Sequence, residues 1–206
     1  AGCAIVAYFA LQVFLREKKL PAIFVLAAAF GLGGGLRQDL LVHMFPLVFW
    51  TLLRHWNGWR TFLTVMAIIG FTIALWYVPM VLLSGGYQNY AAATSRQFNY
   101  HVTRSSILFG NSLFSHFRMI KEFLLCLIGT AFIPLFYLSL YWVTARRDFF
   151  VRMRDWRTAF LVLWILPATL FLTIVFFQNS RYILSFLPAV YIGGTYALIT
   201  LSRRFI

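Results

Sequence analysis

Two opposite charges, Arg37 and Asp39, stand on either side of Gln38 between two apolar runs. The runs, residues 20–36 and 40–53, are each shorter than the roughly 20 residues that a membrane-spanning helix needs. The polar link is therefore expected below the membrane surface, where charges are costly and are usually paired or functional. Two interpretations stay open: a local ion pair or snorkelling arginine, or an arginine that binds an anion over a water-filled cavity.

A second arginine, Arg181, follows Gln178-Asn179-Ser180 and directly precedes the last apolar segment. The link between the last two apolar segments is short, so Arg181 is expected at the outer edge of the membrane. There it is either an ordinary interfacial anchor or a functional residue, because positive charge normally avoids the outer side.

Chemistry based on metals, nucleophiles or acid pairs has little support. Cys3 and Cys126 lie far apart inside apolar segments and indicate neither a disulfide framework nor a metal site. The histidines show no metal-ligand spacing, and we expect His43 to be a packed polar residue of a helix. We therefore predict neither a metal site nor a cofactor.

Small residues mark one face of the segment before Arg37. Ala27, Gly31 and Gly35 recur every four residues, which predicts a helix face cleared for close packing against a neighbour. A phosphate-binding glycine loop would need a preceding strand and a following Lys-Ser/Thr, and the sequence has neither.

The elements that must position these residues are membrane helices. Of the 206 residues, 62% are hydrophobic and only 11% are charged, too few charges to cover a soluble domain. The net charge of +13 comes from basic residues between apolar runs, which indicates membrane topology and no nucleic-acid partner. The sequence predicts an all-α, polytopic integral membrane bundle, one domain over residues 1–206, with about seven apolar segments. The segments are residues 1–15, 20–36, 40–53, 61–83, 123–144, 158–177 and 182–201.

Basic residues between the segments predict the orientation. Four stretches hold 12 of the 18 lysine and arginine residues, so we expect them, and the C-terminus, in the cytoplasm. They are residues 16–19, 54–60, 145–157 and 202–206. Residues 84–122 are then expected outside, in the periplasm or a lumen, as a largely non-helical loop that ends in an interfacial helix over 107–122. The chain starts inside an apolar segment without a charged leader, so we expect a further N-terminal part before Ala1.

Two stretches resemble bacterial membrane glycosyltransferases of the C-type (GT-C) fold, the class of the protein mannosyltransferases and the aminoarabinose transferases of lipid A. Residues 33–41, Gly-Gly-Gly-Leu-Arg-Gln-Asp-Leu-Leu, with Phe45-Pro46-Leu47 after them, resemble one family segment. Residues 180–189, Ser-Arg-Tyr-Ile-Leu-Ser-Phe-Leu-Pro-Ala, resemble the closing helix of the family. Gln38 stands where the family has proline, which puts the shape of the local turn in question.

The resemblance implies an enzyme of the cell envelope, in the bacterial inner membrane. It would move a sugar from a polyprenyl-phosphate donor to a lipid, protein or glycan acceptor on the outer face, with membrane lipids around it. In the family the general base lies in the first outer loop, which here would lie upstream of Ala1, so the catalytic residue is expected outside this sequence.

The same resemblance implies which arginines meet the donor. Arg37, Arg181 and Arg104 would neutralise the phosphate that leaves with the lipid, and Arg96 is a weaker candidate. Possible sugar or lipid contacts are Asp39, Tyr87, Tyr90 and Tyr182. Tyr87 and Tyr90 equally fit an aromatic belt at the membrane interface.

Other classes of membrane protein remain as alternatives. An O-antigen polymerase or ligase also handles polyprenyl-linked sugars and uses arginines of its outer loops. A non-catalytic lipid-binding or assembly subunit would need no acidic residue. A transporter is the least favoured, because no pair of broken helices repeats across two halves of the sequence. An acidic residue in the first outer loop of the full-length sequence would favour the transferase.

Overall fold

The computed structural model describes residues 2–15, 20–55, 58–105, 113–144, 156–175 and 180–205. Within these ranges all regular structure is helical, as the composition predicts. The elements are α1 (Gly2–Leu15), α2 (Leu20–Leu36), α3 (Asp39–Arg54), α4 (Trp59–Leu83), α5 (Tyr87–Ser105), α6 (Leu113–Thr144), α8 (Trp156–Leu170), a π-helical turn η2 (Phe171–Val175), a 3-10 helix η3 (Ser180–Ser185) and α9 (Leu187–Phe205).

Three helices are long and apolar enough to cross a membrane, and these identify the chain as a membrane protein by length and composition. They are Trp59–Leu83, His116–Thr144 and Trp156–Ile174. Each contains or overlaps one of the predicted segments. Gly2–Leu15 and Leu20–Leu36 are apolar helices of lesser length.

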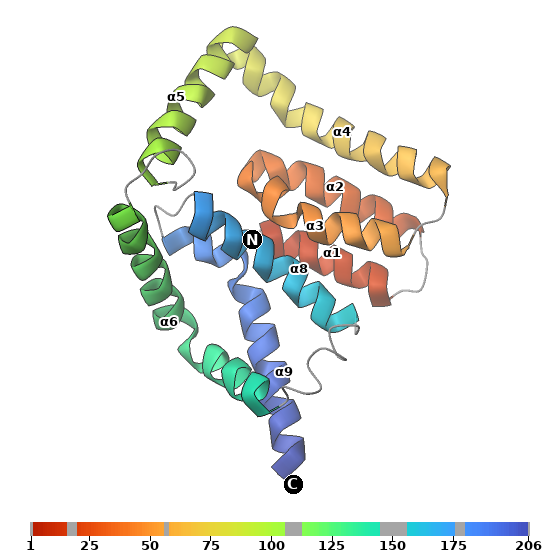
Figure 1. Ribbon diagram of the computed structural model, residues 1–206. Helices are drawn as coiled ribbons and strands as arrows, with labels where there is room; N and C mark the ends of the chain where they lie inside the picture. Colours follow the sequence, from red (N-terminus) through yellow and green to blue (C-terminus); the bar gives the residue numbers. More distant parts are fainter. Residues whose placement is uncertain are drawn as a thin grey trace.

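The break between α2 and α3 falls at the predicted link. α2 ends at Leu36 and α3 begins at Asp39, and the two helices pack against each other as a hairpin. The two apolar runs on either side of the link thus form a helical hairpin and not one long interrupted helix. α1 packs against both of its helices, and α8 packs against α3 (Figure 1).

The small face of α2 packs against α4, as the glycine spacing predicts. A Cβ atom added to Gly31 would lie 1.9 Å from Oγ1 of Thr72, and one added to Gly35 would lie 2.8 Å from Cγ of Trp76. This close approach lets the indole N–H of Trp76 donate a hydrogen bond to the carbonyl oxygen of Gly31 at 2.9 Å. Side chains at these glycines would push the two helices apart.

The expected non-helical character of residues 84–106 is wrong, because residues 87–105 form α5. The helix expected over residues 107–122 is helical in its described part, since α6 begins at Leu113. The chain turns from α4 into α5 at Gly85 and Gly86, whose φ angles of 80° and 102° lie in the left-handed region that favours glycine. α5 then runs away from α4 at the corner seen at the top of Figure 1 and returns toward α6.

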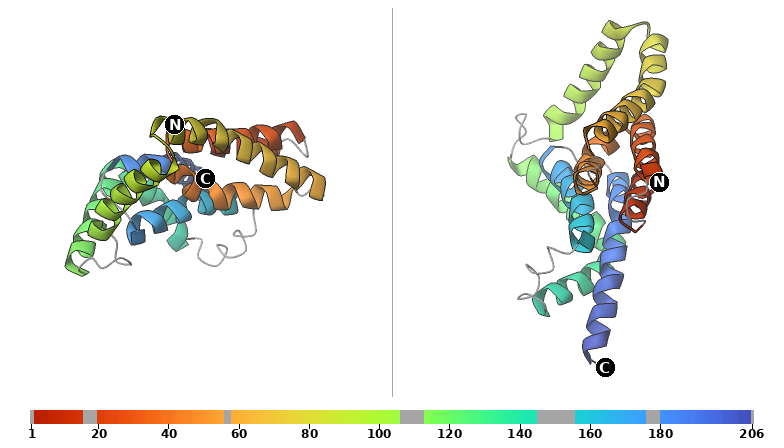
Figure 2. Two further views of the ribbon diagram at one scale, coloured as in Figure 1. Left: turned by 90° about the horizontal axis from the view of Figure 1, so that it is seen from above. Right: turned by 90° about the vertical axis from the view of Figure 1, so that its right-hand side faces the viewer.

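The C-terminal helices form the other flank of the molecule. α6 packs against α9, and α9 extends beyond the remaining helices, with the C-terminus at its far end (Figures 1 and 2). α6 is kinked, because Ala131 has non-helical φ and ψ angles of −134° and 27°.

Candidate ligand-binding site

A cavity of about 280 Å³ lies where the turn between α2 and α3 meets α1 and η3. We call it the Arg37 cavity. It is lined by Gly2, Cys3, Leu36, Arg37, Asp39, Leu40, His43, Leu184 and Ser185. Residues near the two ends of the sequence thus border the same space, and charged groups are among them.

Arg37 and Asp39 form an ion pair across the turn. Nε of Arg37 donates to Oδ1 of Asp39 at 3.0 Å, and Nη2 of Arg37 donates to Oδ2. The backbone supports this pairing, because the N–H of Leu40 bonds the carbonyl oxygen of Arg37 at 3.0 Å. The side chain of Asp39 is 20% exposed and that of Arg37 is 42% exposed. The local ion pair that the sequence allowed is therefore present, and its arginine also lines the cavity. Binding of an anion by Arg37 stays a prediction.

His43 is the most deeply buried polar residue of this cavity. Its exposed fraction is 1%, and neither ring nitrogen has a hydrogen-bond partner among the described residues. The ring packs edge-on against Phe171, with centroids 4.9 Å apart. The sequence correctly placed His43 on a packed helix but did not connect it with the site. A signal was available, because His43 follows Asp39 by four residues and so shares its face of α3.

The η3 segment supplies the opposite wall of the Arg37 cavity through Leu184 and Ser185. Trp164 of α8 holds this wall, since its indole N–H donates to the carbonyl oxygen of Ser185 at 3.1 Å. Arg181 and Tyr182 lie in η3, one turn before these lining residues. Their side chains, and that of Arg104 in α5, lie outside the described part of the structure.

The tyrosines of α5 lie apart from the Arg37 cavity lining. Tyr87 is 66% exposed. The hydroxyl oxygen of Tyr90 accepts a hydrogen bond of 2.9 Å from Nε2 of Gln38, and its ring packs edge-on against Tyr77 with centroids 5.4 Å apart. Gln38 thus ties the α2–α3 turn to α5. Arg96 is an exposed residue of the same helix.

Basic and aromatic residues gather at the other end of α3. Phe14 of α1 stacks on Trp156 of α8 at 5.3 Å between centroids and packs against Trp50 at 4.9 Å. The guanidinium of Arg54 lies 5.8 Å from the centroid of Phe14 and 5.6 Å from that of Trp50. Three helix ends that adjoin basic links, those of α1, α3 and α8, therefore meet at one end of the bundle. The Arg37 cavity lies at the opposite end of α3, roughly 24 Å away at 1.5 Å per residue.

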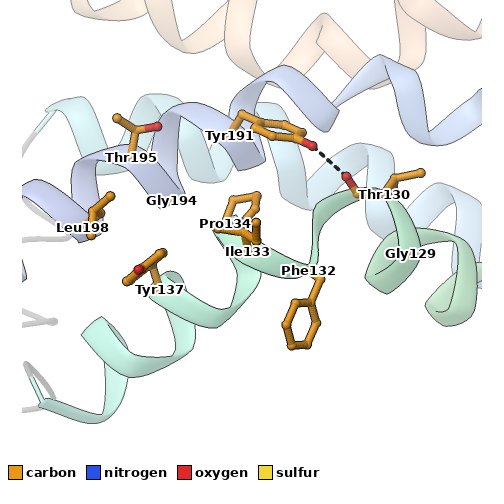
Figure 3. Close-up of a pocket in the computed structure, with 10 residues that line it drawn as sticks. All are labelled: Gly129, Thr130, Phe132, Ile133, Pro134, Tyr137, Tyr191, Gly194, Thr195 and Leu198. Carbon is orange, nitrogen blue, oxygen red and sulfur yellow. Dashed lines mark hydrogen bonds between the residues drawn. The ribbon is translucent and has the colours of Figure 1, made fainter.

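A second cavity, of about 410 Å³, follows the kink of α6 beside α9, and Figure 3 shows its lining residues. We call it the Pro134 cavity. Pro134 has no N–H to donate to the carbonyl oxygen of Thr130 one turn earlier. The hydroxyl of Tyr191 on α9 donates to that oxygen instead, at 2.7 Å (Figure 3). None of the described lining residues of this cavity is charged.

Comparison with protein-family models, with curated proteins and with solved structures finds no match for this chain. The geometry of the Arg37 cavity is thus the main basis for a functional proposal. The two motifs over residues 33–41 and 180–189 are its second basis.

Proposed function

We propose that this chain is the donor-binding part of a membrane glycosyltransferase with a GT-C-like bundle of about seven segments. The enzyme would transfer a sugar from a polyprenyl-phosphate donor to a lipid, protein or glycan acceptor. One observation carries the proposal. Arg37 and the η3 segment that bears Arg181 are far apart in the sequence, yet they border one cavity.

The chemistry of donor cleavage explains why arginines would be used there. When the sugar leaves, negative charge builds on the oxygens of the lipid phosphate. A guanidinium contacts two such oxygens at once and keeps its charge at any working pH. The ion pair with Asp39 holds the guanidinium of Arg37 at the cavity edge. Arg37 would thus be oriented before the donor arrives, with Arg181 as the second cation.

The distribution of basic residues supports a site on the outer face of the membrane, and the resemblance to the bacterial transferases implies that this is the bacterial inner membrane. The helix ends next to the basic links meet in the Phe14–Trp50–Arg54 cluster, where arginines and aromatic rings suit the cytoplasmic interface. The Arg37 cavity lies at the opposite end and would face outward. The C-terminus, which carries Arg203 and Arg204, would lie in the cytoplasm.

Sugar transfer by the full-length protein tests the proposal. Arg37→Lys and Arg181→Lys keep the charge but lose the two-point contact, so each should slow transfer from a polyprenyl-phosphate sugar, and the alanine variants should slow it further. Loss of one charge-assisted contact costs about 1.5–3 kcal/mol, which is about tenfold to over a hundredfold in rate if the contact tightens in the transition state. Rates are compared at matched amounts of folded protein in the membrane.

Arg118→Lys is the matched control. Arg118 is also ion-paired, with Nε 3.3 Å from Oε1 of Glu122, but it is exposed and does not line the Arg37 cavity. This variant should transfer sugar at the normal rate. If Arg37→Lys and Arg181→Lys also keep normal rates while their alanine variants lose only protein yield, both arginines are membrane anchors, because lysine snorkels as well as arginine does.

A further inference from the structure

His43 stands out among the buried polar side chains. It is 99% buried by area, it borders the Arg37 cavity, and both of its ring nitrogens are without a hydrogen-bond partner in the described structure. Neutral imidazole carries one donor and one acceptor. Each such group costs free energy when it is buried without a partner.

The surroundings of His43 give no packing reason for an imidazole. Its neighbours on the buried face of α3 are Leu40, Met44 and Leu47, and its ring contact is Phe171. An apolar ring would fill the same space without leaving polar atoms unpaired. The cavity that His43 lines has room for such a partner, because its volume of about 280 Å³ far exceeds the roughly 30 Å³ share of one water molecule.

We propose that His43 is a ligand-binding residue of the Arg37 cavity and that its ring N–H donates a hydrogen bond to a phosphate oxygen of the bound lipid. This inference rests on the proposed function, because it takes the phosphate of a polyprenyl-linked donor as the ligand. Phosphate oxygens only accept hydrogen bonds, so they match the donors of both His43 and Arg37. Arg37 would supply the charge at the exposed side of the cavity, and His43 would fix the position of the phosphate at its buried side.

Binding of decaprenyl phosphate to the full-length protein in detergent tests this inference. His43→Phe keeps the ring volume but removes both nitrogens, so the Kd should rise about tenfold or more. The Tm without ligand should stay the same or rise, because a buried unpaired group has been removed. His43→Gln keeps a donor and an acceptor and should recover part of the affinity. Met44→Leu is the matched control, a volume-conserving change at the next residue of α3 that does not line the cavity, and it should bind normally.

A second measurement uses the unaltered protein, in case His43→Phe does not fold. Histidine labelled with ¹⁵N in its ring gives a signal for His43 that is assigned by its loss in His43→Gln. That signal should shift on addition of decaprenyl phosphate and stay in place with decaprenol, which has the chain but no phosphate. An unshifted signal at saturating decaprenyl phosphate would overturn the inference.

The remaining outcomes separate the inference from the proposed function. If His43→Phe binds decaprenyl phosphate as tightly as the wild type while Arg37→Ala does not, the role of His43 is refuted and the donor site at Arg37 stands. If the wild type does not bind decaprenyl phosphate, both are refuted. Inorganic phosphate that binds equally well, with the same dependence on His43, would refute the assignment to a lipid-linked ligand.

Discussion

The Arg37 cavity and the Pro134 cavity both lie where a helix is interrupted. They differ in whether the polar groups beside the interruption have hydrogen-bond partners in the described structure. In the Pro134 cavity, the carbonyl oxygen that the proline leaves without a helical donor is bonded by the hydroxyl of Tyr191. In the Arg37 cavity, both ring nitrogens of His43 stay without a partner in the described structure, next to an ion pair.

This difference separates a structural polar contact from a candidate site. Inside a membrane protein, a backbone group freed by proline is commonly re-satisfied by a neighbouring helix, and Tyr191 does this for α6. A buried polar group that the fold leaves unsatisfied calls for an explanation, and a ligand is one such explanation. The Pro134 cavity is the larger of the two, so the choice of the Arg37 cavity as the candidate site rests on its polar groups and not on its volume.

The first way to test the comparison is to disturb the packing of α9 against α6 at the Pro134 cavity. A Cβ atom on Gly194 would lie 2.4 Å from Cβ of Pro134 and 2.5 Å from its Cα, so Gly194→Ala must force α9 away from α6. We expect a loss of about 1–3 kcal/mol in unfolding free energy, measured by denaturation in detergent. Donor binding at the Arg37 cavity should change little.

Gly129→Ala is the control for that prediction. Gly129 lines the same cavity, but an added Cβ would meet nothing within 4 Å. This variant should be as stable as the wild type. Alanine is a better helix former than glycine, so helix propensity cannot explain a loss in either variant. Equal losses for both glycine variants would show that the contact with Pro134 does not determine the effect.

A smaller effect is expected from removing the hydroxyl that bonds the kink. Tyr191→Phe leaves the carbonyl oxygen of Thr130 without its donor, at a cost of about 1 kcal/mol in unfolding free energy. Sugar transfer and donor affinity should remain normal, in contrast to His43→Phe. A Tyr191→Phe variant with normal stability and impaired transfer would reverse the assignment of the two cavities.

The smallest effect concerns Gln38, which joins the α2–α3 turn to α5. Gln38→Leu and Tyr90→Phe each remove one side of the hydrogen bond, and Tyr90→Phe keeps the ring contact with Tyr77. A double-mutant cycle should give a coupling of about 0.5–1 kcal/mol in unfolding free energy. Zero coupling would mean that the exposed bond contributes nothing and that packing alone holds α5 at the turn.

Residues 84–105 belong to the stretch expected as a largely non-helical loop, yet residues 87–105 form α5. The glycines of Ser84-Gly85-Gly86 do form a sharp corner. After the corner, however, residues 91–97 are Ala-Ala-Ala-Thr-Ser-Arg-Gln, and alanine, arginine and glutamine are strong helix formers. Hydropathy locates membrane segments, but it does not distinguish a polar helix from a polar loop.

Features that depend on neighbours along the chain follow directly from the sequence. Long apolar runs specify helices, the polar link at Gln38 specifies a break, and glycines four residues apart specify a bare helix face. Spacing also placed Asp39 and His43 on one face of α3. The tertiary structure was needed to show that η3 borders the same cavity as Arg37 and that His43 is buried without a hydrogen-bond partner among the described residues. Local spacing fixes which side chains share a helix face, whereas the choice of which faces meet depends on packing between segments far apart in the chain.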